Sequence, residues 1–273
     1  MVLESLMNPL TAEKTPSKML LYGFLFAAVG SLLALWIFRD QASMVMVFLT
    51  VIASVPIMYN TIKYEETRDL QETDEKILLK GHWKALKFFM YLFFGFIMAY
   101  AVIFIFFPAS TVQSLFQTQL ETIGQINAKI SGNVVSTNLL LQIFFNNFKV
   151  LLFCIFFAFF YGAGAIFILT WNASVIGAAI GTFVRDKISG VFSYFTLIPL
   201  ALVRYMTHGF FEILAYFIGG LAGGIISIAV INHDFESETF KNVLKDSIDL
   251  IILAVIILVI AALIEVFITP LFF

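Results

Sequence analysis

Apolar runs long enough to cross a lipid bilayer recur along this chain and constrain its fold more than any other feature. They lie at about 19–38, 43–60, 85–107, 144–169, 209–231 and 248–269. Each is close to the roughly 20 residues that a spanning helix needs. Inside hydrocarbon, backbone N–H and C=O groups must be satisfied within the segment, which favours helices. Only 12% of the residues are charged. The sequence therefore predicts an all-α polytopic membrane protein with about six spans.

Basic residues predict the orientation of these spans, because cytoplasmic loops are enriched in Lys and Arg. Residues 61–87 hold six Lys or Arg, whereas 108–142 hold one. We expect 61–87, 232–247 and the N-terminus to be cytoplasmic, and the C-terminus to lie outside the plasma membrane. Residues 1–84 then form an N-terminal helical hairpin with a charged cytoplasmic loop, and 85–273 form a membrane core.

Two shorter apolar runs fit a simple series of spans less well. Residues 172–184 are few for a full crossing, and 191–206 contain Pro199 and end near Arg204. Irregular backbone at membrane depth is tolerated where protein or water covers it. We expect 191–206 to be a re-entrant or interfacial helix on the outer side, with the chain turning at His208–Gly209.

The outer segment 108–142 is rich in Ser, Thr, Gln and Asn, with apolar residues every three or four positions. This spacing predicts an amphipathic helix. Such a helix lies flat on the membrane surface or packs against the other helices, and its amphipathicity does not separate the two.

Four ionisable residues form the candidate polar site. Arg204, His208 and Glu212 are spaced four apart, which places them on one face of a continuous helix. With a turn at 208–209 they instead converge across a break, and Glu265 of the last span becomes the acid to expect beside them. Intramembrane ionisable residues mark functional sites by default, but a paired structural clasp is the alternative. His82, among loop charges, is expected to be solvated.

Glycines spaced four apart allow close helix crossings. The candidates for packing are Gly162, Gly164, Gly177, Gly181, Gly209, Gly219, Gly220, Gly223 and Gly224. Packing within the chain or in a homodimer is one interpretation of this pattern, and a substrate path lined by bare backbone is the other.

Several function classes find no support. The net charge of −2 argues against nucleic-acid binding. Cys154 is the single cysteine, so neither a disulfide framework nor a cysteine metal cluster is expected. His208 and Glu212 have the spacing of two metal ligands, but no third is visible. We expect no metal, no cofactor and no catalytic residues.

Five short motifs, in this order, carry a resemblance to a known family. They are Asn146–Asn147, Phe160-Tyr-Gly162-Ala-Gly164, Asn172 followed by Val-Ile-Gly177, His208-Gly209-Phe-Phe-Glu212, and Glu265 followed by Thr269–Pro270. The set resembles the stage II sporulation protein M (SpoIIM)-like family of multi-pass membrane proteins over about 86–273. Thr207 stands where the resemblance leads us to expect Pro.

The resemblance implies a core of about five spans and no assigned enzymatic activity. In endospore formers the family member works with peptidoglycan hydrolases during engulfment. Relatives also occur in organisms that do not sporulate, so we do not carry that role over.

Two functions remain open from the sequence. One is a non-enzymatic membrane scaffold that assembles with partners, as a homodimer or with membrane or envelope proteins, and organises the bilayer. The alternative is a small transporter or lipid-translocating permease with a polar site near His208 and Glu212, since such sites are built at broken helices.

Overall fold

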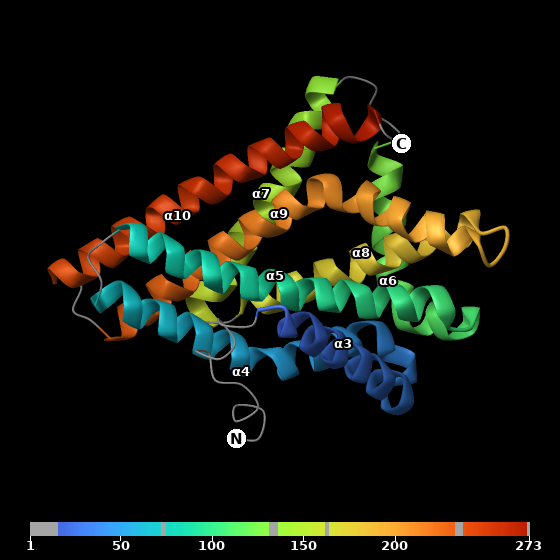
Figure 1. Cartoon of the computed structure of the whole chain (residues 1–273), viewed down its shortest axis with the longest axis horizontal. Helices are drawn as coiled ribbons and strands as arrows, with labels where there is room; N and C mark the ends of the chain where they lie inside the picture. Colours follow the sequence, from blue (N-terminus) through green and yellow to red (C-terminus); the bar gives the residue numbers. More distant parts are fainter. Residues whose placement is uncertain (1–15, 72–74, 131–135, 162–163, 233–236, 272–273) are drawn as a thin grey trace.

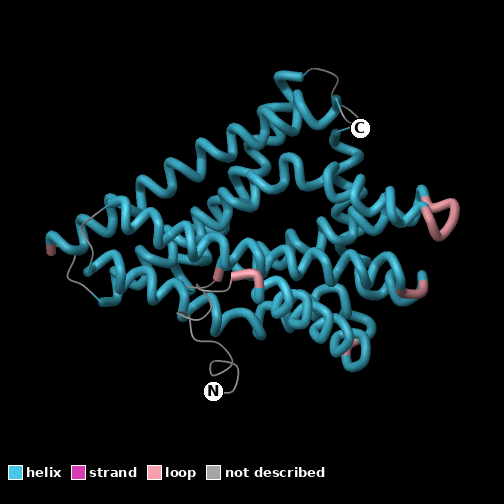
Figure 2. The backbone as a smooth tube through the Cα atoms, viewed as in Figure 1, coloured by secondary structure: helices cyan, strands magenta, loops and turns pink. Residues whose placement is uncertain are grey.

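The computed structural model describes residues 16–71, 75–130, 136–161, 164–232 and 237–271, and these are helical with no strand (Figures 1 and 2). The long helices are α3 (Lys18–Ile37), α4 (Ala42–Gln71), α5 (Glu75–Phe106), α6 (Ala109–Ile130), α7 (Ser136–Tyr161), α8 (Ala165–Lys187), α9 (Ser193–Asn232) and α10 (Glu238–Leu263). Short turns η1 (Arg39–Gln41), η2 (Ile264–Ile268) and η3 (Thr269–Leu271) complete this part of the chain. All the long helices except α6 are apolar and long enough to span a membrane. The predicted all-α, multi-spanning fold class is confirmed.

α5 and α9 form the centre of the bundle. In the most apolar stretch of each span, 78% of the α5 residues and 83% of the α9 residues are buried inside the protein. The corresponding share is 28% for α3 and 22% for each of α7 and α10. α5 packs against α3 and α8, while α9 packs against α7 and α10. The outer helices therefore present most of their apolar surface outward, as expected of helices that face lipid.

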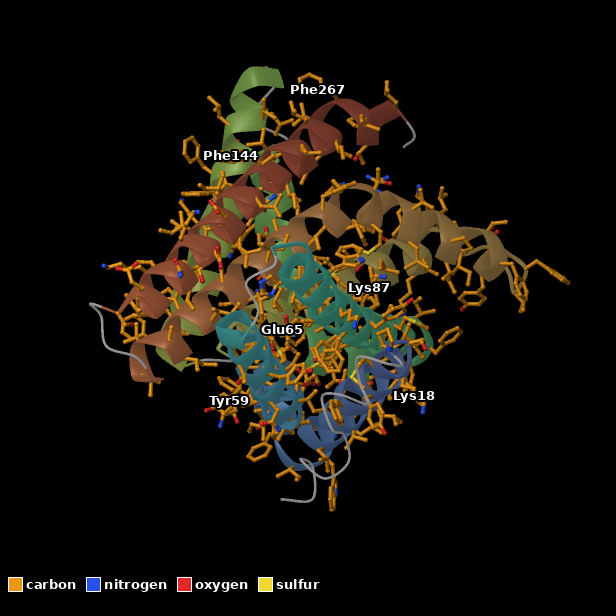
Figure 3. The ribbon with its side chains drawn as sticks, turned by 60° about the vertical axis from the view of Figure 1, so that its left-hand side comes forward. Lys18, Tyr59, Glu65, Lys87, Phe144 and Phe267 are labelled. Carbon is orange, nitrogen blue, oxygen red and sulfur yellow. The ribbon has the colours of Figure 1, made fainter. Side chains whose placement is uncertain are left out.

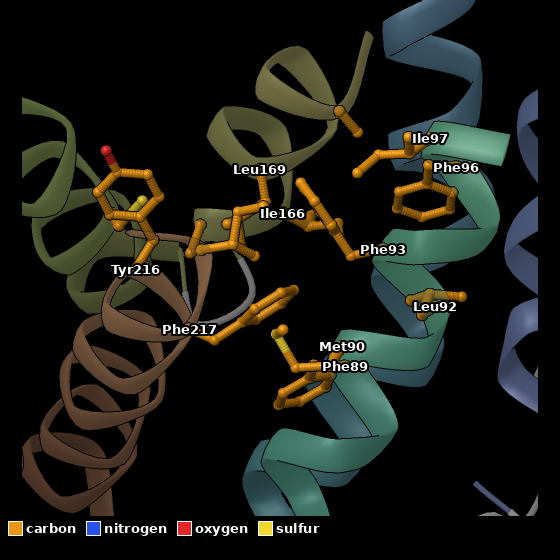
Figure 4. Close-up of a cluster of buried hydrophobic side chains, with 14 of the residues drawn as sticks. Phe89, Met90, Leu92, Phe93, Phe96, Ile97, Ile166, Leu169, Tyr216 and Phe217 are labelled. Carbon is orange, nitrogen blue, oxygen red and sulfur yellow. The ribbon is translucent and has the colours of Figure 1, made fainter. Parts of the chain in front are cut away.

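Aromatic side chains join the two central helices (Figure 4). The ring of Phe217 from α9 stacks on Phe89 of α5 with centroids 5.7 Å apart, and it meets Phe93 edge-on at 5.9 Å. Ile166 and Leu169 of α8 are fully or almost fully buried in the same cluster. Offset-stacked and edge-on rings add to the stabilisation from apolar burial, so this cluster fixes α5, α8 and α9 relative to one another.

Glycine permits the closest helix crossing, between α3 and α5. A Cβ added at Gly23 would lie 2.1 Å from the Leu92 carbonyl oxygen, and one at Gly95 would lie 2.3 Å from that of Leu20. The two backbones thus touch with no side chain between them. Both glycines belong to the small-residue interfaces that membrane helices favour, and neither was among the glycines singled out from the sequence.

The predicted packing glycines of α8 and α9 also face neighbours in the same chain. A Cβ at Gly177 would lie 2.6 Å from Cβ of Tyr100, and one at Gly181 would lie 2.3 Å from the Phe104 ring, both on α5. A Cβ at Gly223 would lie 2.6 Å from the Ile155 carbonyl oxygen of α7. These glycine faces are therefore occupied within one protomer.

Two predicted boundaries are wrong. The span expected at 144–169 is divided, since α7 ends at Tyr161 and α8 begins at Ala165. The run at 172–184, expected to be short for a crossing, belongs to α8, which is 23 residues long. The sequence stays apolar or small from 150 to 169, so hydropathy does not mark the boundary, whereas Gly164, the residue before α8, does.

The break expected at His208–Gly209 is absent, because α9 is one helix of 40 residues that includes Pro199. Thr207, unlike a proline, keeps the N–H that the helix ladder needs. Its hydroxyl donates to the Val203 carbonyl oxygen one turn earlier, at 2.5 Å. The helix bends near its middle (Figure 1) instead of breaking.

α6 packs against the bundle, which was one of the two arrangements that its amphipathic pattern allowed. In Figure 1 it runs across the direction of α5. Val112, Leu115 and Phe116 are buried. The Gln119 amide donates to the Ser43 carbonyl oxygen at 3.2 Å and to the Ser174 hydroxyl at 3.1 Å, which links α6 to α4 and α8. Residues 136–142, expected to be part of this outer segment, instead form the first turns of α7.

Candidate functional site

A polar cavity of about 450 Å³ lies between α7, α8, α9 and the end of α10. Its polar lining residues are Gln142, Asn146, Asn147, Lys149, Asn172, Glu212, Tyr216 and Glu265. In Figure 3, Phe144 of α7 and Phe267 of η2 lie at the same end of the molecule. Polar groups from four elements converge here within an otherwise apolar bundle.

Two carboxyl groups form the core of this site. The side chains of Glu212 of α9 and Glu265 of η2 lie close enough to interact. Asn147 of α7 donates from its amide nitrogen to Glu212 Oε1. Three helical elements thus meet at one acidic pair.

Local helix geometry positions Glu265. η2 (Ile264–Ile268) is a π-helical turn that continues directly from α10, and such turns often occur at functional sites. The Thr269 hydroxyl after it donates to the Ile264 carbonyl oxygen at 3.2 Å. His208 Nδ1 lies 3.3 Å from the same hydroxyl. His208 therefore holds the end of α10 beside α9, one turn before Glu212.

Arg204 does not join this cluster, although the sequence grouped it with His208 and Glu212. Its guanidinium lies 5.5 Å from the centroid of the Phe183 ring of α8, and it hydrogen-bonds the neighbouring Tyr205. It lines a separate cavity of about 350 Å³ with Asp186 and Lys187. Three of the four predicted ionisable residues are thus brought together, and the fourth lies against α8.

The remaining motif residues have different surroundings. Asn172 lines the cavity, and its amide donates to the Ile168 carbonyl oxygen at 2.7 Å. Gly209 lies inside α9 with no tight contact, since an added Cβ would meet only Met206 Cε at 3.4 Å. Pro270 is exposed in η3. Gly162 lies outside the described residues.

Sequence reasoning did not identify Lys149 and Tyr216 as cavity residues. Tyr216 follows Glu212 by four positions, so helical spacing alone places both on one face. Lys149 offers a weaker signal, because it is an isolated basic residue in an apolar helix. Each lines the cavity from its own element.

His82 also differs from its predicted role, because it is buried instead of solvated. Its Nδ1 lies 3.1 Å from Glu65 Oε2, and the Glu65 side chain is 0% exposed (Figure 3). This pair joins α4 to α5 and lies outside the polar cavity.

The cavity chemistry suits a proton, a small cation or a protonated amine. A pair of carboxyl groups offers several acceptor sites, and the amides of Asn147 and Asn172 add polar contacts. Among the described residues, no group of three or more His, Cys, Asp and Glu side chains could hold a metal ion.

Comparison with known proteins gives one family. The model for the family described as Stage II sporulation protein M matches residues 84–270. This range includes the whole polar cavity and leaves α3, α4 and the start of α5 outside it. No curated protein and no solved structure is significantly similar to the chain.

Proposed function

Because this chain belongs to the stage II sporulation protein M family of membrane proteins, we propose that it carries a cationic or protonatable solute across the bilayer without catalysing a chemical reaction. The observation that carries this proposal is the Glu212–Glu265 pair, which faces an open polar cavity inside a multi-span bundle. Ionisable residues within membrane-spanning segments are costly and mark ion, proton or substrate pathways.

The surroundings of Glu212 favour transport over a purely structural clasp. A clasp would be dry and closed, whereas Glu212 is only half-buried and lines a cavity of about 450 Å³. A space of this size lies within the range of small-molecule sites. A solute with an N–H⁺ group would donate hydrogen bonds to the two carboxyl groups.

We further propose the orientation that the charge pattern predicts. If all seven candidate spans cross the bilayer, the two ends of the chain lie on opposite sides. This arrangement agrees with a cytoplasmic N-terminus and an external C-terminus in the plasma membrane. Labelling of cysteines introduced at positions 237 and 190 from either side of intact cells tests it, and external labelling of position 237 would contradict it.

Transport is tested in proteoliposomes with the Glu212→Gln variant. The assays are proton flux under an imposed potential, uptake of labelled methylammonium, and movement of fluorescent phospholipids between leaflets. We expect the wild type to move at least one of these probes and Glu212→Gln to lose most of that activity. Glutamine keeps the size and the hydrogen-bonding capacity of the side chain, but it cannot ionise.

Glu121→Gln is the matched control, because Glu121 is exposed on α6 and hydrogen-bonds only its helical neighbour Gln117 at 3.3 Å among the contacts described for it. It should transport like the wild type. No flux of any probe, or equal flux in both variants, would refute the proposal.

A scaffold role is the second candidate, and the N-terminal hairpin favours it. α3 and α4 both precede the matched region. Leu25, Leu32 and Trp36 of α3 are exposed, Trp36 at 80%. This apolar face suits a partner helix in the bilayer as well as lipid. Vesicles that change shape on reconstitution, in the absence of any flux, would favour the scaffold.

A further inference from the structure

We propose that the transported solute is a phospholipid with a primary amine in its headgroup, bound with its acyl chain along α7; this inference rests on the proposed transport function. The polar cavity shares a lining residue with a second hollow, an apolar groove of about 700 Å³ on α7. Lys149 lines both. A ligand that fills the two together needs a charged head and an apolar tail.

The groove has the dimensions of one acyl chain. It extends along α7 from Lys149 to Phe159 and is lined by Leu152, Phe153, Ile155 and Phe156. Ten residues of helix rise about 15 Å, which is half of the roughly 30 Å hydrocarbon core of a bilayer. An acyl chain therefore matches the groove in length and in polarity.

Charge complementarity identifies the headgroup. Lys149 lines both the groove and the polar cavity, so its ammonium is the group that would bind a phosphate between the acyl chain and the rest of a headgroup. Beyond it, the Glu212–Glu265 pair supplies negative charge and acceptor oxygens. A headgroup amine satisfies these acceptors as a donor. A headgroup with no positive charge fits less well, because it leaves the acidic pair without a cation. A quaternary ammonium headgroup also fits less well, because it has no N–H to donate.

A second lysine-bearing groove provides a matched comparison. Lys87 lies 5.3 Å from the centroid of the Trp83 ring, and both line a hollow of about 260 Å³ with Tyr91 and Phe94. That hollow has an aromatic wall and a lysine, but it shares no lining residue with the polar cavity. It lacks the acidic end that recognises an amine.

The test is photocrosslinking in nanodiscs of phosphatidylcholine that contain a trace of photoactivatable phosphatidylethanolamine. Crosslinked residues are located by mass spectrometry of the full chain. We expect capture at 149–159 on α7. Lys149→Gln should lower it about tenfold, since the loss of a charge-assisted contact of about 1.4 kcal/mol is a factor of ten. Lys87→Gln should leave it unchanged. Unlabelled phosphatidylethanolamine should compete better than phosphatidylglycerol.

The inference fails if capture on α7 is insensitive to Lys149→Gln, if Lys87→Gln lowers it equally, or if phosphatidylglycerol competes as well. It is separable from the proposed function. If Glu212→Gln abolishes flux but Lys149→Gln does not change lipid capture, the transport proposal is supported and the lipid proposal is refuted. If Lys149→Gln lowers lipid capture but the wild type moves none of the probes, the lipid-binding site is supported and the transport proposal is refuted.

Discussion

Replacing Gly95 with alanine tests the closest contact in the fold. The added Cβ would lie 2.3 Å from the Leu20 carbonyl oxygen, 2.7 Å from the Phe24 backbone nitrogen and 2.9 Å from Gly23 Cα. All three are backbone atoms of α3, so no side chain can rotate away. An ordinary contact of about 3.4 Å or more requires the helices to separate by about 1 Å.

The expected loss of stability follows from two opposing effects. Overpacking of this kind costs up to about 3 kcal/mol. Alanine gains about 1 kcal/mol over glycine in helix propensity. The net expectation for Gly95→Ala is a free energy of unfolding that is lower by about 2 kcal/mol.

Gly124→Ala is the matched control, because no atom lies within 4 Å of a Cβ built at Gly124 on α6. The gain in helix propensity is common to both variants and cancels between them. Their free energies of unfolding should therefore differ by about 3 kcal/mol, or roughly 100-fold in the unfolding equilibrium. Equilibrium unfolding in mixed micelles, followed by circular dichroism, measures this difference. Equal stability of the two alanine variants, within about 0.5 kcal/mol, would show that α3 does not approach α5 as described.

Two further predictions concern buried polar pairs. Tyr100→Phe removes the hydroxyl that lies 3.0 Å from Thr50 Oγ1 between α5 and α4, and it should cost about 1 kcal/mol in the same unfolding assay; no loss would show that the pair adds nothing to stability. His82→Leu removes the imidazole 3.1 Å from Glu65 and should cost about 3 kcal/mol, because a buried acid loses a polar partner. Adding Glu65→Leu to His82→Leu should restore part of the loss, and a double variant less stable than His82→Leu would contradict this account.

Hydropathy predicted the all-helical, multi-spanning class, because each long apolar run must satisfy its backbone internally. It gave about six full spans, whereas seven of the described helices are long and apolar enough to cross a membrane. It located their ends poorly where apolar residues continue through a turn, as between Tyr161 and Ala165. Pro199 also misled the interpretation of 191–206. A proline does not always end a helix, and α9 continues through the exposed Pro199.

The polar site was accessible to sequence reasoning only in part. Helical spacing relates His208, Glu212 and Tyr216, since all three lie on α9. No local pattern shows which other helix approaches them. The contact of Asn147 with Glu212 joins residues 65 positions apart, and it depends on how α7 packs against α9. Arg204 was grouped with His208 and Glu212 for the same reason. The sequence of α9 does not show that the Phe183 ring of α8 lies beside Arg204.

The length of α9 has a mechanical consequence for the protein. Forty residues make a helix of about 60 Å, twice the roughly 30 Å depth of bilayer hydrocarbon. The helix can remain in the membrane only by bending or tilting, and the extent of either depends on the thickness of the surrounding lipid. Glu212 lies at the middle of this helix. Bilayers of longer or shorter acyl chains should therefore shift Glu212 relative to Glu265, which makes membrane thickness a physical control on the acidic pair.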